Sequence, residues 1–78
     1  MKTYFIHMQK EIAAGTLKIN MPIKAISKID AENIVMKQQL INKHHFNKTN
    51  ALEFRNKYFK TIEVKDKKHL KILKKLFY

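Results

Sequence analysis

The sequence contains no cysteine and no tryptophan, and its 78 residues include one glycine, one proline and one arginine. Without cysteine, neither a disulfide framework nor a thiolate zinc site can reinforce the fold, so we expect a cytoplasmic protein stabilised by packing. A single glycine excludes a glycine-rich phosphate-binding loop. No apolar run approaches the roughly 20 residues that cross a bilayer, and the sequence shows no signal-peptide pattern, so we expect no transmembrane segment.

Acidic residues are also scarce. Six Asp and Glu residues accompany 17 Lys and Arg residues, which gives a formal net charge of +11 at pH 7. The excess is concentrated in residues 57–78, which hold eight lysines against Glu63 and Asp66. Such a charge indicates a polyanionic partner: a nucleic acid, a nucleoprotein, an anionic membrane or an acidic protein surface. Because 45% of the residues are hydrophobic, we expect one compact domain over residues 1–78.

Two alternating segments at the start of the chain predict a β-hairpin. Residues 3–9 and 16–26 alternate as strands do, and Gly15 between them suits a turn that needs a positive φ. Pro22 cannot donate to a β-ladder, which predicts a sheet edge, a bulge or a break at that position. The second segment places its apolar residues on one face, namely Leu17, Ile19, Met21, Ile23 and Ala25.

Three further elements are expected after the hairpin. Ser27, followed three residues later by an acid, predicts the start of a helix that runs to about residues 42–45. Residues 51–56 suit a short helix capped by Asn50. Residues 58–65 alternate again and predict a third strand.

Asp66 predicts the N-cap of a last helix over residues 67–77. Its apolar stripe would consist of Leu70, Leu73, Leu76 and Phe77, with Ile72 at the margin. The resulting order, β-β-α-β-α, predicts a small single-domain α+β fold with an antiparallel sheet covered by helices on one face. The other face would be open to solvent or to a partner.

The basic C-terminal segment is the main candidate site. It is either an ordinary solvated helix face, a surface that tracks phosphates, or an amphipathic helix on an anionic membrane surface. We predict polyanion binding by Lys65, Lys67, Lys68, Lys71, Lys74 and Lys75, together with Arg55, Lys57 and Lys60.

The bias towards lysine limits the kind of recognition to expect. Bidentate contacts with base edges are mainly made by arginine, and Arg55 is the only one here. Backbone contacts should therefore dominate, with poor sequence preference. Five aromatic residues are candidates for stacking on bases, although core packing is the simpler account of Tyr4 and Phe59; the set is Tyr4, Phe5, Tyr58, Phe59 and Tyr78.

Metal binding and catalysis have little support in the sequence. The histidines are His7, His44, His45 and His69, and no cysteine or nearby acid completes a ligand set, so we expect no metal and no cofactor. Glu63 and Lys65 match the Glu-x-Lys half of a metal-dependent nuclease motif, but Asp30, the nearest upstream aspartate, is already placed to serve a helix start. No serine has a triad context, so we expect no enzyme and no catalytic residues.

One segment resembles a known group of proteins. A strand that ends in alternating residues, Leu17 to Ala25, is followed by Ser27-Lys28-Ile29-Asp30-Ala31 at a helix start. This layout, over residues 3–45, resembles very short phage and mobile-element accessory proteins, some anti-CRISPR proteins included. The resemblance implies a compact inhibitor or accessory protein that occupies a surface of a host nucleoprotein complex.

The sequence therefore favours a non-enzymatic basic protein that engages a nucleic acid or a nucleoprotein. A small structural component of a ribonucleoprotein, of the ribosomal type, is the alternative; against it, such proteins usually contain more arginine and glycine. Salt dependence separates the classes of partner, because binding to phosphates weakens steeply with salt.

Overall fold

The chain folds around a long β-hairpin. In the computed structural model, which describes residues 1–77, β1 (Lys2–Ile12) pairs with β2 (Gly15–Ala25) in an antiparallel register that joins Lys2 to Ala25 and Ile12 to Gly15. Gly15 has φ +127, as the predicted turn requires. Strand β3 (Lys60–Val64) pairs with the other side of β1, which gives the sheet order β2-β1-β3. Strand β2 is therefore an edge strand, the environment in which Pro22 is tolerated.

The first helical segment follows the hairpin directly. Ser27 caps α1 (Lys28–Val35), and its Oγ accepts a hydrogen bond from the backbone N–H of Asp30. The helix continues without a break as a π-helix, η1 (Met36–Lys43), so the predicted end near residues 42–45 is confirmed but its second half is not α-helical. His45 follows in a left-handed conformation, with φ 59.

The second helix is longer than the sequence predicted. Helix α2 (Lys48–Tyr58) is capped by Asn47, whose Oδ1 accepts from the N–H of Asn50, so Asn50 is not the cap. Helix α3 (Lys67–Phe77) has the predicted bounds. Asp66 caps it as expected, since its Oδ1 accepts from the N–H of His69 at 2.8 Å.

The sheet separates two apolar clusters. Alternate residues of β1, Tyr4, Ile6 and Met8, are buried against α1, η1 and α2 in the main core, together with Leu17, Ile19, Ala25, Ala31, Val35, Met36, Leu40 and Ala51. The side chains between them point to the opposite face. There Phe5 is fully buried, and its ring stacks on that of Phe77 of α3.

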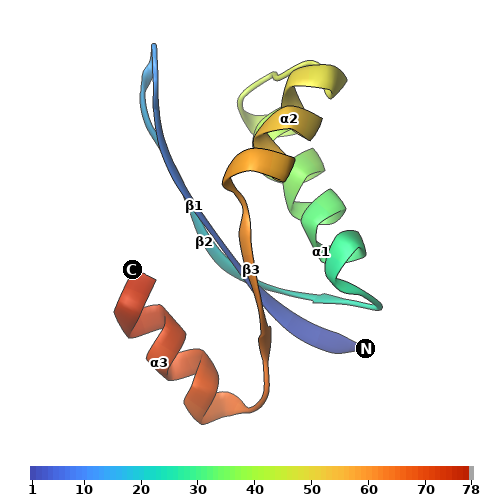
Figure 1. The fold of residues 1–78 in the computed structure, drawn as a ribbon, viewed down its shortest axis with the longest axis vertical. Helices are drawn as coiled ribbons and strands as arrows, with labels where there is room; N and C mark the ends of the chain where they lie inside the picture. The colour runs from blue at the N-terminus through green and yellow to red at the C-terminus, as the bar shows by residue number, and fades with distance from the viewer. Residues whose placement is uncertain (78) are drawn as a thin grey trace.

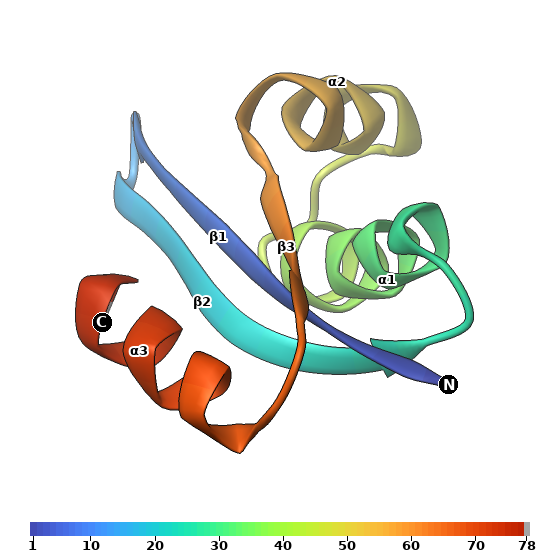
Figure 2. The same ribbon diagram turned by 60° about the horizontal axis from the view of Figure 1, so that its bottom comes forward.

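Helices therefore cover both faces of the sheet, as Figures 1 and 2 show. The α+β class and the antiparallel sheet are confirmed. The prediction that helices cover only one face of the sheet is wrong, because α3 lies on the side opposite α1 and α2. Ile62 and Val64 of β3 share that side with Phe5 through their register, so the strand supplies an apolar surface for α3.

Candidate polyanion-binding surface

The lysines of α3 all face solvent. Lys67, Lys68, Lys71, Lys74 and Lys75 are exposed and occupy one arc of the helix, because their spacing keeps them within about 120° at 100° per residue. The sheet-facing arc consists of Leu70, Leu73 and Phe77, of which Leu73 is the most buried. Leu76 was expected in that stripe, but it is 69% exposed.

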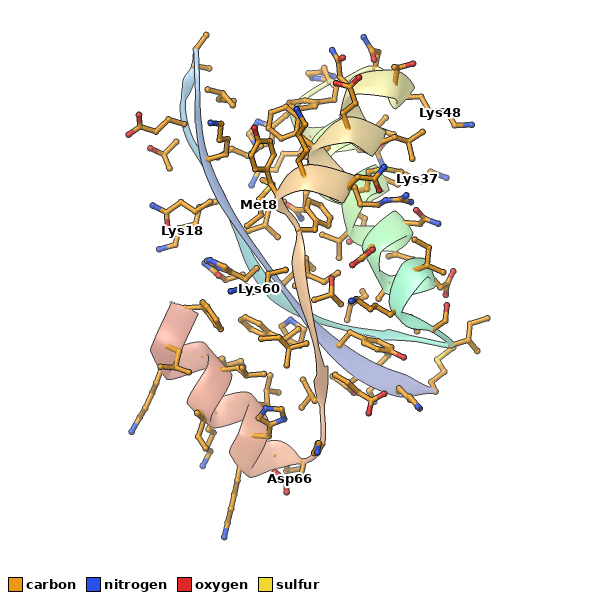
Figure 3. All side chains as sticks on the ribbon, viewed as in Figure 1. Met8, Lys18, Lys37, Lys48, Lys60 and Asp66 are labelled. Atoms are coloured by element: carbon orange, nitrogen blue, oxygen red, sulfur yellow. The ribbon has the colours of Figure 1, made fainter. Side chains whose placement is uncertain are left out.

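The strands extend this cationic region beyond the helix. Lys18 and Lys24 of β2 pair with Gln9 and Thr3, and Lys60 of β3 pairs with His7, so all three lie on the α3 side of the sheet. Figure 3 shows Lys18 and Lys60 on the same side of the sheet as α3. Lys65 lies in the turn that leads into α3, where its backbone N–H donates to His69 Nδ1 at 3.0 Å.

Helix α3 and β2 are in direct contact at this surface. Leu70 and Lys24 line one shallow hollow of about 270 Å³ with Thr3 and Pro22. Lys67 and Lys74 neighbour Leu70 on the helix surface, at i−3 and i+4. The lysines of α3, of β2 and β3 and of the turn before α3 therefore lie on one side of the sheet. We call them the lysine surface: Lys18, Lys24, Lys60, Lys65, Lys67, Lys68, Lys71, Lys74 and Lys75.

The acids are distributed in the opposite way. Within residues 1–77, two acids lie on the same side of the sheet as the nine lysines: Asp66, which is engaged at the N-terminus of α3, and Glu11 of β1, which pairs with Thr16 near the hairpin turn. The other four acids, Asp30, Glu32, Glu53 and Glu63, lie on or face the helices across the sheet. The Thr61 hydroxyl of β3 donates to Glu32 Oε2, which confirms that this side of β3 faces α1.

Two of the predicted binding residues lie elsewhere. Arg55 and Lys57 belong to α2, across the sheet from α3. The Arg55 guanidinium donates to Asn33 Oδ1 of α1, and its Nη2 donates to Asn56 Oδ1 at 2.9 Å. The structure therefore does not bring Arg55 and Lys57 to the lysine surface, whereas the other seven predicted residues do meet there.

Lys18 and Lys24 were absent from the predicted site. The signal that identifies them is their position in the alternation of β2, where they fall on the face opposite Leu17 and Ile19. The burial of Phe5 shows that a helix covers this face, and the local sequence pattern alone does not predict that burial.

Most of the described aromatic rings are packed away from the lysine surface. Tyr4 is buried in the main core, and Phe46, Phe54, Tyr58 and Phe59 pack against that core across the sheet from α3. Phe5 and Phe77 pack against each other beneath α3. Of the proposed stacking residues, Tyr78 lies outside the described residues.

The structure also shows the surroundings of the histidines and of Glu63 from the nuclease-like pattern. His7 Nδ1 is hydrogen-bonded with Asn20 Oδ1, and its ring lies 4.4 Å from that of Phe77. In the part of the chain that the structure describes, no three His, Asp or Glu side chains are grouped closely enough to hold a metal ion. Glu63 pairs with Lys2 at 3.1 Å, and this hydrogen-bonded carboxylate raises the pKa of Lys2 above its ordinary value.

Comparison with protein-family models, curated proteins and solved structures found no match for this chain. Among residues 1–77, no helix has the length and apolar character needed to cross a membrane.

Proposed function

We propose that the protein is a non-enzymatic binding protein whose lysine surface contacts the phosphates of double-stranded nucleic acid, either free or within a nucleoprotein, with little dependence on base sequence. The observation that supports this proposal is the collection of nine exposed lysines, against two acids, on one side of the sheet. Each ammonium that neutralises a phosphate releases condensed counterions, and this release drives binding at low salt.

Phosphates suit this surface better than bases do. An ammonium is a point charge that matches a phosphate oxygen, whereas bidentate reading of a base edge requires a planar fork. Arg55, the one such fork, is held by Asn33 and Asn56 across the sheet. Contacts with phosphates position a protein on a duplex without reading its sequence.

Duplex is favoured over single strands for two reasons. Proteins that bind single strands combine a basic groove with open aromatic rings on which bases stack, and the aromatic side chains of residues 1–77, apart from the half-buried Phe77, are packed away from the lysine surface. A duplex also presents one charge per about 1.7 Å of its axis. The 11 residues of α3 span about 16 Å, so the helix lies alongside several phosphates at once.

Fluorescence anisotropy with a short labelled duplex tests the proposal. The Lys67, Lys68, Lys71 and Lys75→Ala variant should lose at least about tenfold in affinity at about 50 mM salt, with a shallower salt dependence. The control replaces Lys28, Lys37, Lys43 and Lys57, four exposed lysines across the sheet, and it carries the same net charge. Equal losses in both variants would show that only the overall charge matters.

The identity of the nucleic acid is tested with the same assay. Two duplexes of unrelated sequence should bind within about threefold of each other, because phosphate contacts carry no sequence information. A single strand of the same length should bind more weakly. If the protein ignores bare duplex and binds a purified nucleoprotein at salt that abolishes phosphate contacts, its partner is a protein surface, as expected of an inhibitor of a host complex.

A further inference from the structure

A second concave site lies across the sheet from the lysine surface. A hollow of about 480 Å³ is lined by Asn33 of α1, by Met36, Lys37 and Ile41 of η1, and by Lys48 of α2. Met36 is almost fully buried and Ile41 is half-buried, so the inner part of the hollow is apolar. Its volume falls within the range of about 300 to 1,000 Å³ that small-molecule sites occupy.

The charged side chains that line this hollow, Lys37 and Lys48, are both cationic. Lys37 and Lys48 are exposed, and Figure 3 shows both on the side of the molecule away from α3. Asn33 Oδ1 accepts from the Arg55 guanidinium, so the group that Asn33 offers to a ligand is its Nδ2 amide, a donor. No acid is among the lining residues. This combination selects a negatively charged head group.

The π-helix shapes the apolar part of the site. Residues five apart point about 140° from each other in an α-helix, whereas i→i+5 bonding brings them towards the same side. In η1 this places Met36 and Ile41 together in the hollow. π-Helical turns are rare and occur frequently at functional sites, where they re-aim side chains.

We propose that this hollow binds a small single-chain amphiphilic anion, such as a medium-chain fatty acid or an alkyl phosphate. The head group would bind the ammonium groups of Lys37 and Lys48 and the amide of Asn33. The positive end of α2, which begins at Lys48, adds to this attraction. The chain of the ligand covers Met36 and Ile41. The site shares no residue with the lysine surface, so the inference does not rest on the proposed function.

Calorimetry and ¹⁵N-edited NMR with octyl phosphate, kept below its micelle concentration, test the inference. One octyl phosphate should bind per chain, with the largest shift changes at Asn33, Lys37, Ile41 and Lys48. Inorganic phosphate, which lacks the chain, should bind at least about tenfold more weakly because it covers no apolar surface. Anionic phosphatidylglycerol vesicles should not bind in place of octyl phosphate, because the hollow accepts a free single chain.

Matched variants locate the binding. The Lys37 and Lys48→Gln variant should lose about tenfold in affinity for octyl phosphate, since charge-assisted hydrogen bonds are the stronger ones. The Lys28 and Lys43→Gln variant removes the same charge outside the hollow and should bind as the wild type does. Equal affinity in the two variants, shift changes centred on Ile72 and Leu76 of α3, or binding to vesicles alone would each overturn the inference.

Discussion

The ring of Phe77 on α3 stacks on the ring of Phe5 on β1, with their centroids 5.9 Å apart and their planes inclined by 27°. Phe5 is fully buried although it points away from the main core. The same Phe77 ring lies 4.4 Å from that of His7, two residues further along β1. The position of α3, and with it the display of five lysines, therefore depends on a small cluster that is separate from the main core.

Replacing Phe77 by Ala should detach α3. A fully buried Phe→Ala change costs about 3 to 5 kcal/mol, and Phe77 is only half-buried, so we expect about 2 kcal/mol less stability. Urea denaturation gives this difference, and duplex affinity should fall with it. Leu76→Ala is the matched control on the same helix, because Leu76 is 69% exposed and its replacement should stay within about 0.5 kcal/mol. Equal costs for the two changes would contradict the assigned packing of α3.

The contribution of the strands to the lysine surface is tested on the hairpin itself. Lys18 and Lys24→Ala should make the negative slope of log K against log salt shallower by up to about 2. The reason is that each phosphate that is no longer neutralised reduces the magnitude of the slope by about 0.9. Lys2 and Lys10→Ala removes two lysines from the same hairpin on the opposite face of the sheet. That variant should keep the wild-type slope. An equal change of slope in the two variants would show that both faces of the hairpin contribute equally to binding.

Gly15 is expected to tolerate no L-amino acid without cost. A Cβ at this position would meet no atom within 4 Å, so steric exclusion does not apply, but φ is +127. Gly15→Ala should therefore cost about 1 to 3 kcal/mol through backbone strain alone. D-alanine, introduced by chemical synthesis, favours positive φ and should retain most of the stability. If L-alanine and D-alanine are equivalent in thermal unfolding, strain at Gly15 is not the cause.

The contact between Lys2 and Glu63 predicts a pH dependence on the alkaline side. The hydrogen bond with Glu63, followed by the charge of its carboxylate, raises the pKa of Lys2 above 10.5 in the folded protein. The folded state therefore holds this proton more tightly than the unfolded chain does. The resulting stabilisation is complete below the ordinary pKa and is lost as pH rises through the raised one.

The difference in urea midpoint between wild type and Lys2→Gln measures this contribution. It should be small, because both side chains are largely exposed and salt screens such pairs. It should be present near neutral pH and disappear above the pKa of Lys2. A difference that stays constant into strongly alkaline solution would mean that the charge of Lys2 does not stabilise the fold.

Most helices and strands of this fold can be predicted from local sequence patterns. Gly15, Ser27 and Asp66 each predict a boundary correctly, because turn and cap chemistry involves residues only a few positions apart. The alternation of β2 also identifies its buried face, as the burial of Leu17 and Ile19 confirms.

The features that the sequence did not predict depend on contacts between distant segments. Alternation in β1 shows that Phe5 opposes Tyr4, but only the return of the chain after β3 decides that α3 covers Phe5. The π-helix has no local signature, since the same residues also suit an α-helix. Arg55 was grouped with the binding lysines by its charge, yet Asn33, 22 positions away, engages it instead.

The unequal distribution of cations across the sheet also has a kinetic consequence. With nine lysines and two acids on one side of the sheet, and the other four acids across it, the molecule carries an electric dipole moment. A negatively charged partner exerts a torque on such a dipole before the two surfaces touch. The cationic side is therefore oriented towards the partner during diffusional encounter, and a larger fraction of collisions occurs in a productive orientation.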